Sequence, residues 1–108
     1  MLGGFQQEEV TEEHNDLVNS NLAPINSILG VNVEQWKVDS VYNQFVGGTN
    51  YFFYLSDISG NKYSVCIYLT PQNNVPPAVM KGYQGHVPHK PKFLIYSSGF
   101  KQYQWLMT

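Results

Sequence analysis

The sequence predicts an α+β domain in which one helix packs on an antiparallel sheet. Apolar residues follow a helical spacing between residues 11 and 29, whereas strand-like runs separated by turn signals follow from residue 35. One helix followed by sequential strands is an α+β pattern, because the helix must bury its apolar stripe on one face of the sheet. The chain has 108 residues, and domains typically have about 50–250 residues, so we expect residues 1–108 to form a single domain.

The N-terminal part is expected to be an arm followed by one long helix. Residues 1–7 lack apolar periodicity and contain two glycines, so we expect a flexible arm. The apolar residues from Thr11 to Leu29 lie on one helical face. Thr11 is suited to cap the start of this helix, and Gly30 is suited to end it. Pro24 interrupts the pattern, because an interior proline removes a hydrogen bond and kinks or splits a helix.

Four strands are expected to follow the helix, at residues 35–46, 50–56, 62–69 and 78–84. Asp57 to Asn61 form a turn signal between the second and third strands. The alternation of polar and apolar residues breaks at Ser40-Val41-Tyr42, where we expect a bulge.

The C-terminal segment, residues 86–108, contains no motif that decides its structure. A loop rich in proline and histidine precedes a strand-like run at residues 93–96, a turn, and a second apolar run at residues 103–107. These runs would form an extra hairpin on the sheet edge, or Trp105 would add a contact surface.

The turn between the first two strands combines glycine with bulky apolar residues. Gly47 and Gly48 favour a hairpin, because glycine adopts positive φ without a Cβ clash. Phe45 and Val46 lie beside this turn, where polar residues are usual. Apolar side chains at a hairpin tip either pack back into the core or contact a partner.

This turn resembles a known inhibitor motif. Gln44-x-Val46-x-Gly48 is similar to the Gln-x-Val-x-Gly motif of the cystatins, and the continuation Thr49-Asn50-Tyr51 is typical of the stefins, their intracellular branch. Cystatins inhibit papain-like cysteine proteases. The opening Met1-Leu2-Gly3-Gly4, and Pro71-Gln72-Asn73 followed by Gly82-Tyr83-Gln84, support the resemblance up to about residue 85. It implies a cystatin-like fold, an antiparallel sheet wrapped around one long N-terminal helix.

The resemblance implies a protein inhibitor that binds as a three-part wedge. The wedge would enter the cleft of the protease and cover its catalytic cysteine reversibly, without presenting a cleavable bond. In this reading Leu2 anchors the arm in a substrate pocket, and Gly48 lets the hairpin backbone approach the enzyme closely. The implied contact residues are Leu2, Gly3 and Gly4 in the arm, Gln44, Phe45, Val46, Gly47 and Gly48 in the first hairpin, and Pro71, Gln72 and Asn73 in the second.

Three positions depart from the stefin pattern. Gly47 stands where alanine is commoner, which should loosen the loop. Phe45 is bulkier than the usual residue, and Thr70 is inserted into the Leu-Pro pair of the second hairpin. The contacts of the second hairpin are therefore the least supported of the three.

The residues that could carry chemistry favour structural roles. Cys66 lies inside a strand-like run without a glycine-rich turn, so a packed small side chain is favoured over a nucleophile. His86 and His89 flank a proline and provide half a metal site at most, and His14 fits a packed boundary position. We therefore expect no catalytic residues, no metal and no cofactor.

Composition bears on partners and compartment. The chain contains no arginine, which argues against specific nucleic-acid recognition. It shows no signal-peptide pattern and no apolar run near the length of about 20 residues that spans a membrane. A lone cysteine favours the cytoplasm. We expect a monomer that can form a domain-swapped dimer, with Gln44–Gly48 as the hinge.

Two other function classes stay open. One is a non-inhibitory module on the same fold that binds a protein or peptide through its aromatic sheet and tail. The other is an enzyme that uses Cys66 as a thiol nucleophile.

Overall fold

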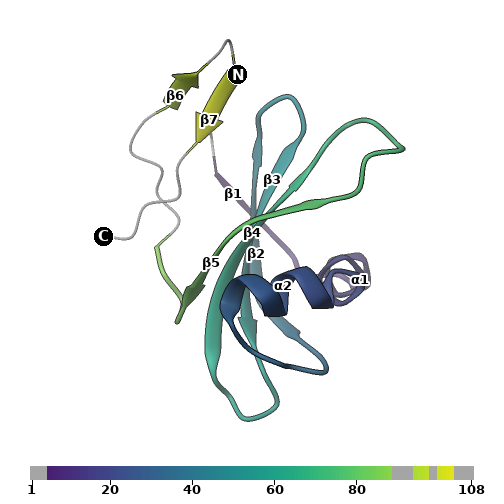
Figure 1. Cartoon of the computed structure of the whole chain (residues 1–108), viewed down its shortest axis with the longest axis vertical. Helices are drawn as coiled ribbons and strands as arrows, with labels where there is room; N and C mark the ends of the chain where they lie inside the picture. Colours follow the sequence, from purple (N-terminus) through teal and green to yellow (C-terminus); the bar gives the residue numbers. More distant parts are fainter. Residues whose placement is uncertain (1–4, 89–93, 98–99, 104–108) are drawn as a thin grey trace.

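The computed structural model describes residues 5–88, 94–97 and 100–103. Within them, a five-stranded antiparallel sheet in the order β1-β2-β3-β4-β5 carries two helices on one face (Figure 1). This arrangement confirms the predicted α+β class. The elements are β1 (Gln6–Glu8), α1 (Glu12–Ser20), α2 (Leu22–Leu29), β2 (Lys37–Phe45), β3 (Thr49–Ser56), β4 (Lys62–Leu69), β5 (Ala78–Gln84), β6 (Leu94–Ser97) and β7 (Phe100–Tyr103).

The helical region consists of two short helices, so the prediction of one long helix is wrong. Helix α1 ends at Ser20, and Asn21, with φ −111° and ψ 31°, separates it from α2. Pro24 explains this position. It has no N–H to donate to the carbonyl of Ser20, four residues earlier, and its ring would clash with that carbonyl. The break therefore precedes the proline by one turn.

The predicted ends of the helical region are confirmed. Thr11 caps α1, since its hydroxyl accepts a hydrogen bond from the backbone N–H of His14 at 3.4 Å. Gly30 ends α2 in the left-handed conformation with φ 69°, which glycine adopts without a Cβ penalty.

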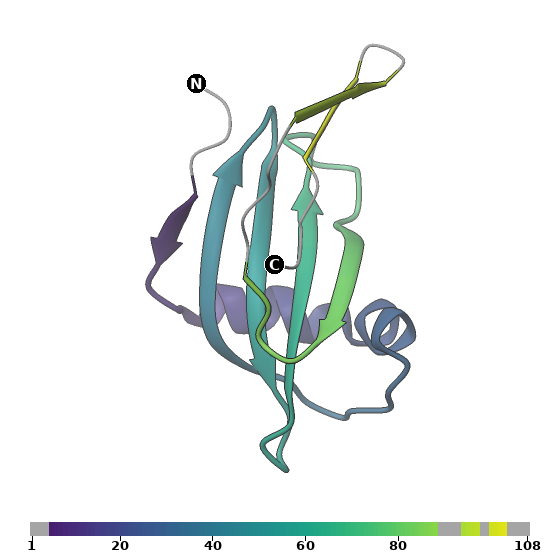
Figure 2. The same cartoon turned by 90° about the vertical axis from the view of Figure 1, so that its left-hand side faces the viewer.

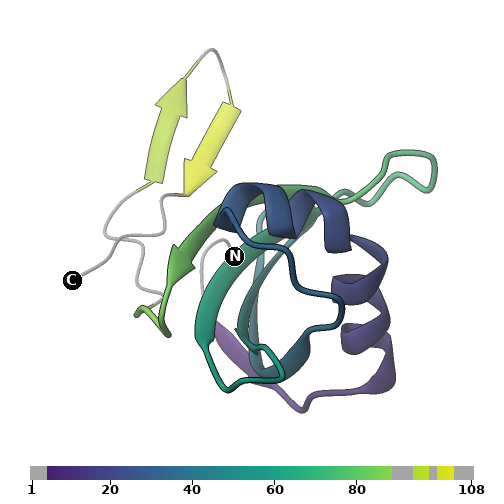
Figure 3. The ribbon, with the colours of Figure 1, turned by 60° about the horizontal axis from the view of Figure 1, so that its bottom comes forward.

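The main core lies between the two helices and the sheet. Figure 3 shows the strands curving around the helices. Trp36, which is 1% exposed, closes one side of this core. Its ring N–H donates to Asn26 Oδ1 at 3.2 Å, and its backbone N–H donates to Asn19 Oδ1 at 2.9 Å. The other buried members are Val18, Ile25, Leu29, Val38, Val41, Phe53, Leu55, Tyr63, Val65 and Ile67.

A smaller aromatic cluster covers the opposite face of the sheet. Phe52, Tyr54 and Cys66 are buried there. Partly buried residues pack against them, namely Phe5, Tyr42, Tyr83 and Val87. The sheet is therefore apolar on both faces.

The strands follow the predicted boundaries closely, with one confirmed irregularity. The pairing of β2 with β3 shifts register between Val38 and Ser40, in the segment where the sequence indicates a bulge. Residues 57–61 form the expected turn, in which Asp57 Oδ1 accepts hydrogen bonds from the backbone N–H groups of Ser59 and Asn61, each at 2.9 Å.

Part of the predicted arm belongs to the fold. Gln6 and Gln7 belong to β1, which pairs with β2 in the register Gln6↔Asn43, Gln7↔Tyr42 and Glu8↔Val41. The prediction of a flexible arm over residues 1–7 is therefore wrong for Gln6 and Gln7. It is also wrong for Phe5, whose ring packs edge-to-face on Phe52 with the ring centroids 4.8 Å apart. Backbone pairing to β2 fixes Gln6 and Gln7 although their side chains are polar and exposed, so the apolar pattern gives no signal.

The C-terminal strands form a separate hairpin. β6 and β7 pair with each other, and neither joins the five-stranded sheet. The prediction of an addition to the sheet edge is therefore wrong for these strands. The second strand, Phe100–Tyr103, begins before the expected run at residues 103–107. Residues 104–108, with Trp105, lie outside the described residues.

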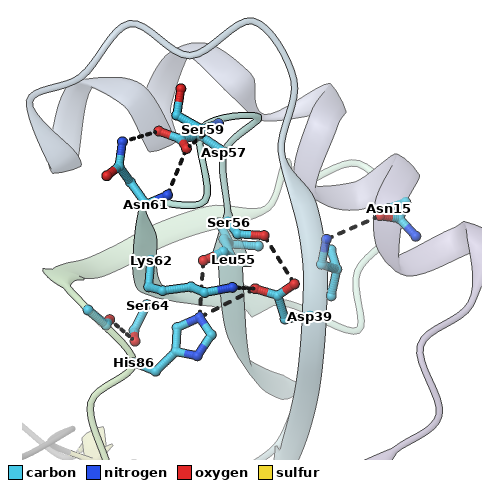
Figure 4. A network of polar contacts seen from close by, with 12 residues as sticks. Asn15, Asp39, Leu55, Ser56, Asp57, Ser59, Asn61, Lys62, Ser64 and His86 are labelled. Carbon is cyan, nitrogen blue, oxygen red and sulfur yellow. Dashed lines mark hydrogen bonds and ion pairs between the residues drawn. The ribbon is translucent and has the colours of Figure 1, made fainter.

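A polar network anchors the segment after β5 at the end of the sheet near the Asp57–Asn61 turn (Figure 4). His86 Nε2 lies 3.1 Å from the carbonyl oxygen of Leu55 and 3.4 Å from Asp39 Oδ2. Ser56 Oγ donates to Asp39 Oδ1 at 3.1 Å, and Lys62 Nζ lies 3.6 Å from Asp39 Oδ2. His86 thus links the segment after β5 to β2 and β3.

No helix among the described residues is long and apolar enough to cross a membrane.

Candidate functional site

The β2–β3 turn is a tight connection of three residues between the pair Phe45↔Thr49. The N–H of Val46 donates to the carbonyl of Gly48 at 3.0 Å. Gly47 has φ 81° and no atom within 4 Å of an added Cβ. The glycine that replaces the commoner alanine therefore serves the backbone conformation of the turn, because other residues avoid positive φ.

The residues before this turn divide into a buried brace and an exposed tip. Gln44 is completely buried, and its Oε1 accepts a hydrogen bond from Asn50 Nδ2 at 3.3 Å. Phe45 is 55% exposed, and Val46 is partly exposed. The hairpin therefore presents apolar side chains to solvent at its tip, whereas Gln44 holds its two strands together from within.

Gly48 is partly exposed and packs closely against β4. A Cβ at this position would lie 2.7 Å from Cζ of Tyr68 and 2.8 Å from the carbonyl oxygen of Leu69. The resemblance suggested that bare backbone at Gly48 faces the enzyme. The structure gives another reason for the glycine, which is the close approach of β4 to the turn.

Tyr68 connects the first hairpin to the second. Its hydroxyl donates to the carbonyl of Gly47 at 3.3 Å, and its ring fills the space beside Gly48. Tyr68 lies outside the stefin-like motifs. Its position one residue before Leu69, which pairs with Thr49, would have indicated its place next to the turn once the strand register was known.

The second hairpin contributes a longer loop, residues 70–77. Thr70 Oγ1 accepts from the N–H of Gln72 at 3.3 Å, which orders the start of the loop. Pro71, Gln72 and Asn73 are all exposed. The extra residue Thr70 is therefore used to shape the bend after β4. An open depression is lined by residues of this loop and its stem, among them Leu69, Asn74 and Pro77.

The N-terminal residues of the predicted site, Leu2, Gly3 and Gly4, lie outside the described residues. The strand that follows them is informative. Because Gln6 pairs with Asn43, which is two residues before Phe45, β1 begins beside the β2–β3 turn.

Two turns and the start of β1 thus meet at one end of the sheet. Thr49 pairs with Leu69, which brings the 70–77 loop next to the β2–β3 turn. Figure 2 shows both connections at the same end of the sheet, opposite the Asp57–Asn61 turn. The end carries Phe45 and Val46, the exposed loop, and the point where the chain enters β1.

The side chains that could carry chemistry lie elsewhere. Cys66 is buried in β4 on the face away from the helices, as predicted for a packed side chain, and burial raises the pKa of its thiol to about 12. His14 is 7% exposed, which confirms the predicted packed position. Within residues 5–88 and the two C-terminal strands, no three side chains of the metal-binding types come together. His89 lies outside these ranges.

A scan against models of known protein families finds no match for this chain. The case for a function therefore rests on the geometry of this end and on the motif within it.

Proposed function

We propose that this protein is a reversible inhibitor of papain-like cysteine proteases and a member of the cystatin superfamily. The observation that carries the proposal is the meeting of the β2–β3 turn, the 70–77 loop and the start of β1 at one end of the sheet. The stefin-like motifs of the two hairpins occur in the β2–β3 turn and at the start of the 70–77 loop. Leu2, Gly3 and Gly4 directly precede Phe5 and β1.

In this proposal the tip of the first hairpin is the apolar anchor. Phe45 is 55% exposed in the free protein, so its remaining burial in a protease cleft would contribute about 1–1.5 kcal/mol. Gln44 positions this tip from inside the sheet, because its amide is bonded to Asn50. A tip held by its own strands loses little conformational entropy on binding, which favours affinity.

The proposed inhibition is non-covalent. The described residues of this end provide side chains for apolar contact and hydrogen bonding, and the thiol of Cys66 is buried within β4. Binding then depends on surface burial and on hydrogen bonds from the exposed amides of Gln72 and Asn73, which are reversible interactions.

The alternative, a non-inhibitory module that binds through the aromatic sheet, receives less support. Phe52 and Tyr54 are 2% and 7% exposed, so these rings are already packed. The only aromatic residue among the exposed large apolar side chains of the described chain is Phe45, which lies at the proposed wedge.

A cytoplasmic location is part of the same proposal. The thiol of Cys66 is free and buried, and a domain whose core forms without a disulfide suits a reducing compartment.

The test is titration of a papain-like protease with the purified protein, with two matched variants. Phe45→Ala removes the exposed apolar side chain of the proposed wedge. Ile58→Ala removes an exposed apolar side chain, 101% exposed, from the turn at the opposite end of the sheet. We expect stoichiometric inhibition by the parent and by Ile58→Ala. Phe45→Ala should bind about 5- to 10-fold more weakly, the equivalent of about 1–1.5 kcal/mol.

Two results would contradict the proposal. A correctly folded parent that fails to inhibit at micromolar concentration would exclude protease inhibition of this kind. Equal weakening by Phe45→Ala and Ile58→Ala would show that binding does not use the proposed end.

A further inference from the structure

A partly buried polar cluster joins β1 to α1 and β2. Glu8, the last residue of β1, directs its carboxylate between α1 and β2. Its Oε1 lies 3.0 Å from His14 Nε2, and its Oε2 accepts a hydrogen bond from Asn43 Nδ2. We call Glu8, His14 and Asn43 the Glu8 clamp.

The proton on His14 has a definite place in this cluster. The backbone N–H of Thr11 donates to His14 Nδ1 at 3.0 Å, so Nδ1 acts as the acceptor. Nε2 then carries the proton and donates to Glu8. Thr11 is the N-cap of α1, so the imidazole that binds Glu8 is fixed by the start of the helix.

Glu8 orients the side-chain amide of Asn43 and leaves the amide oxygen, Oδ1, without a hydrogen bond in the described part of the chain. A carboxylate only accepts hydrogen bonds, so Nδ2 of Asn43 must face it. Asn43 Oδ1 is left buried without a hydrogen-bond partner among the described residues. An unpaired buried acceptor is unfavourable, which indicates that the bond to Glu8 decides how this amide is turned.

The clamp acts where the chain approaches the proposed wedge. β1 has only three residues and lies at the edge of the sheet, so its backbone pairing with β2 is short. Asn43 directly precedes Gln44, the buried brace of the first hairpin. The clamp thus links the strand that follows Leu2–Gly4 to the strand that carries Phe45.

We propose that Glu8 is a positioning residue that directs the N-terminal arm toward the protease and so lengthens the lifetime of the complex. This inference rests on the proposed function and deepens it. The positioning role of Glu8 follows from its two hydrogen bonds, because Asn43 Nδ2 and His14 Nε2 both donate to its carboxylate. The carboxylate of Glu8 offers one acceptor oxygen to each of these donors.

The decisive substitution is Glu8→Ala, which removes both acceptor oxygens. The matched control is Glu9→Ala, which removes the same side chain from the exposed neighbouring residue. We expect Glu8→Ala to dissociate from the protease about tenfold faster with little change in association rate, because changes within one interface act mainly on dissociation. Glu9→Ala should dissociate like the parent.

Deletion of Met1–Gly4 separates positioning from a general loss of structure. If Glu8 acts through the arm, Glu8→Ala should not change the dissociation rate further in the truncated protein. The same tenfold effect in both backgrounds, or an equal effect of Glu9→Ala, would overturn the inference. Thermal unfolding of each variant verifies that it is folded.

Hydrogen exchange distinguishes a failed clamp from a failed function. Glu8→Ala should accelerate exchange at the backbone amides of Gln6–Glu8 in the free protein, whereas Glu9→Ala should leave them unchanged. Accelerated exchange in a protein that inhibits no protease would refute the proposed function and retain the clamp. Unchanged exchange would refute the clamp itself.

Discussion

Replacement of Gly48 by alanine should destabilise the fold through a steric clash with β4. The added Cβ would lie 2.7 Å from Cζ of Tyr68 and 2.8 Å from the carbonyl oxygen of Leu69. Non-bonded heavy atoms prefer about 3.5–4.0 Å. The ring of Tyr68 can swing away, since it is only partly buried. The carbonyl of Leu69 is held by the pairing of Leu69 with Thr49, so the backbone must shift.

Such overpacking typically destabilises a protein by about 1–3 kcal/mol. For a domain of this size, each kcal/mol lowers the melting temperature by about 4–8 °C. Thermal unfolding of Gly48→Ala, monitored by circular dichroism, should therefore show a drop of at least about 4 °C. Tyr68→Ala provides the partner for a double-mutant cycle, because it removes the movable half of the clash.

The cycle separates the clash from other effects of the substitution. In the Tyr68→Ala background, Gly48→Ala should be less destabilising than in the parent, since only the contact with Leu69 remains. Gly47→Ala is the matched control. It has open space around its Cβ and a φ of 81°, so its effect is backbone strain of about 1–2 kcal/mol, and this should not depend on the Tyr68 ring. A parental melting temperature for Gly48→Ala, or strict additivity with Tyr68→Ala, would refute the packing argument.

Three further predictions concern the thiol, the hinge and the chemistry of inhibition. Burial raises the pKa of the Cys66 thiol from 9.0 to about 12, so the folded state binds this proton more tightly than the unfolded state. The free energy of unfolding should therefore decrease as the pH rises from 9 toward 12. Urea unfolding at pH 8 and pH 11 should show a smaller pH-dependent decrease in Cys66→Ala than in the parent, and an equal decrease would argue against burial of this thiol. Mild heating should yield a domain-swapped dimer in which Gln44–Gly48 is straightened, and this dimer should inhibit poorly, whereas a dimer as active as the monomer would exclude this hinge. A protease whose catalytic cysteine carries a small blocking group should still bind in gel filtration, and a covalent adduct in denaturing mass spectrometry of the complex with active enzyme would contradict reversible binding.

The sheet was predictable because its strands carry their own signals. Residues 62–69 alternate in hydrophobicity and fill β4 from end to end, and the Asp57–Asn61 turn has side chains that bond its own backbone. The bulge near Ser40 was visible as a break in the alternation. Local chemistry decides these features, and the sequence displays it directly.

Other features depend on partners distant in the sequence. β1 was missed because Gln6 and Gln7 are polar and gain their conformation by pairing with Asn43 and Tyr42. The break at Asn21 lies one turn before the proline that causes it.

The candidate site shows the same division between local and distant effects. The exposed tip at Phe45 could be expected from the residues around the Gly-Gly pair. The burial of Gln44 and the packing of Gly48 against Tyr68 require the register of three strands. The Glu8 clamp joins residues up to 35 positions apart, so no local pattern could have indicated it.

The central claim is that one end of the sheet enters the protease cleft, and a hydrogen-exchange footprint of the complex tests it most directly. The protein would be measured alone and with a saturating amount of a papain-like protease whose catalytic cysteine is blocked. The account predicts slower exchange at residues 45–48 and in the 70–77 loop, with no change at the Asp57–Asn61 turn at the opposite end. Protection confined to the Asp57–Asn61 turn or to the aromatic face around Tyr54, or no protection in a complex that forms, would contradict it.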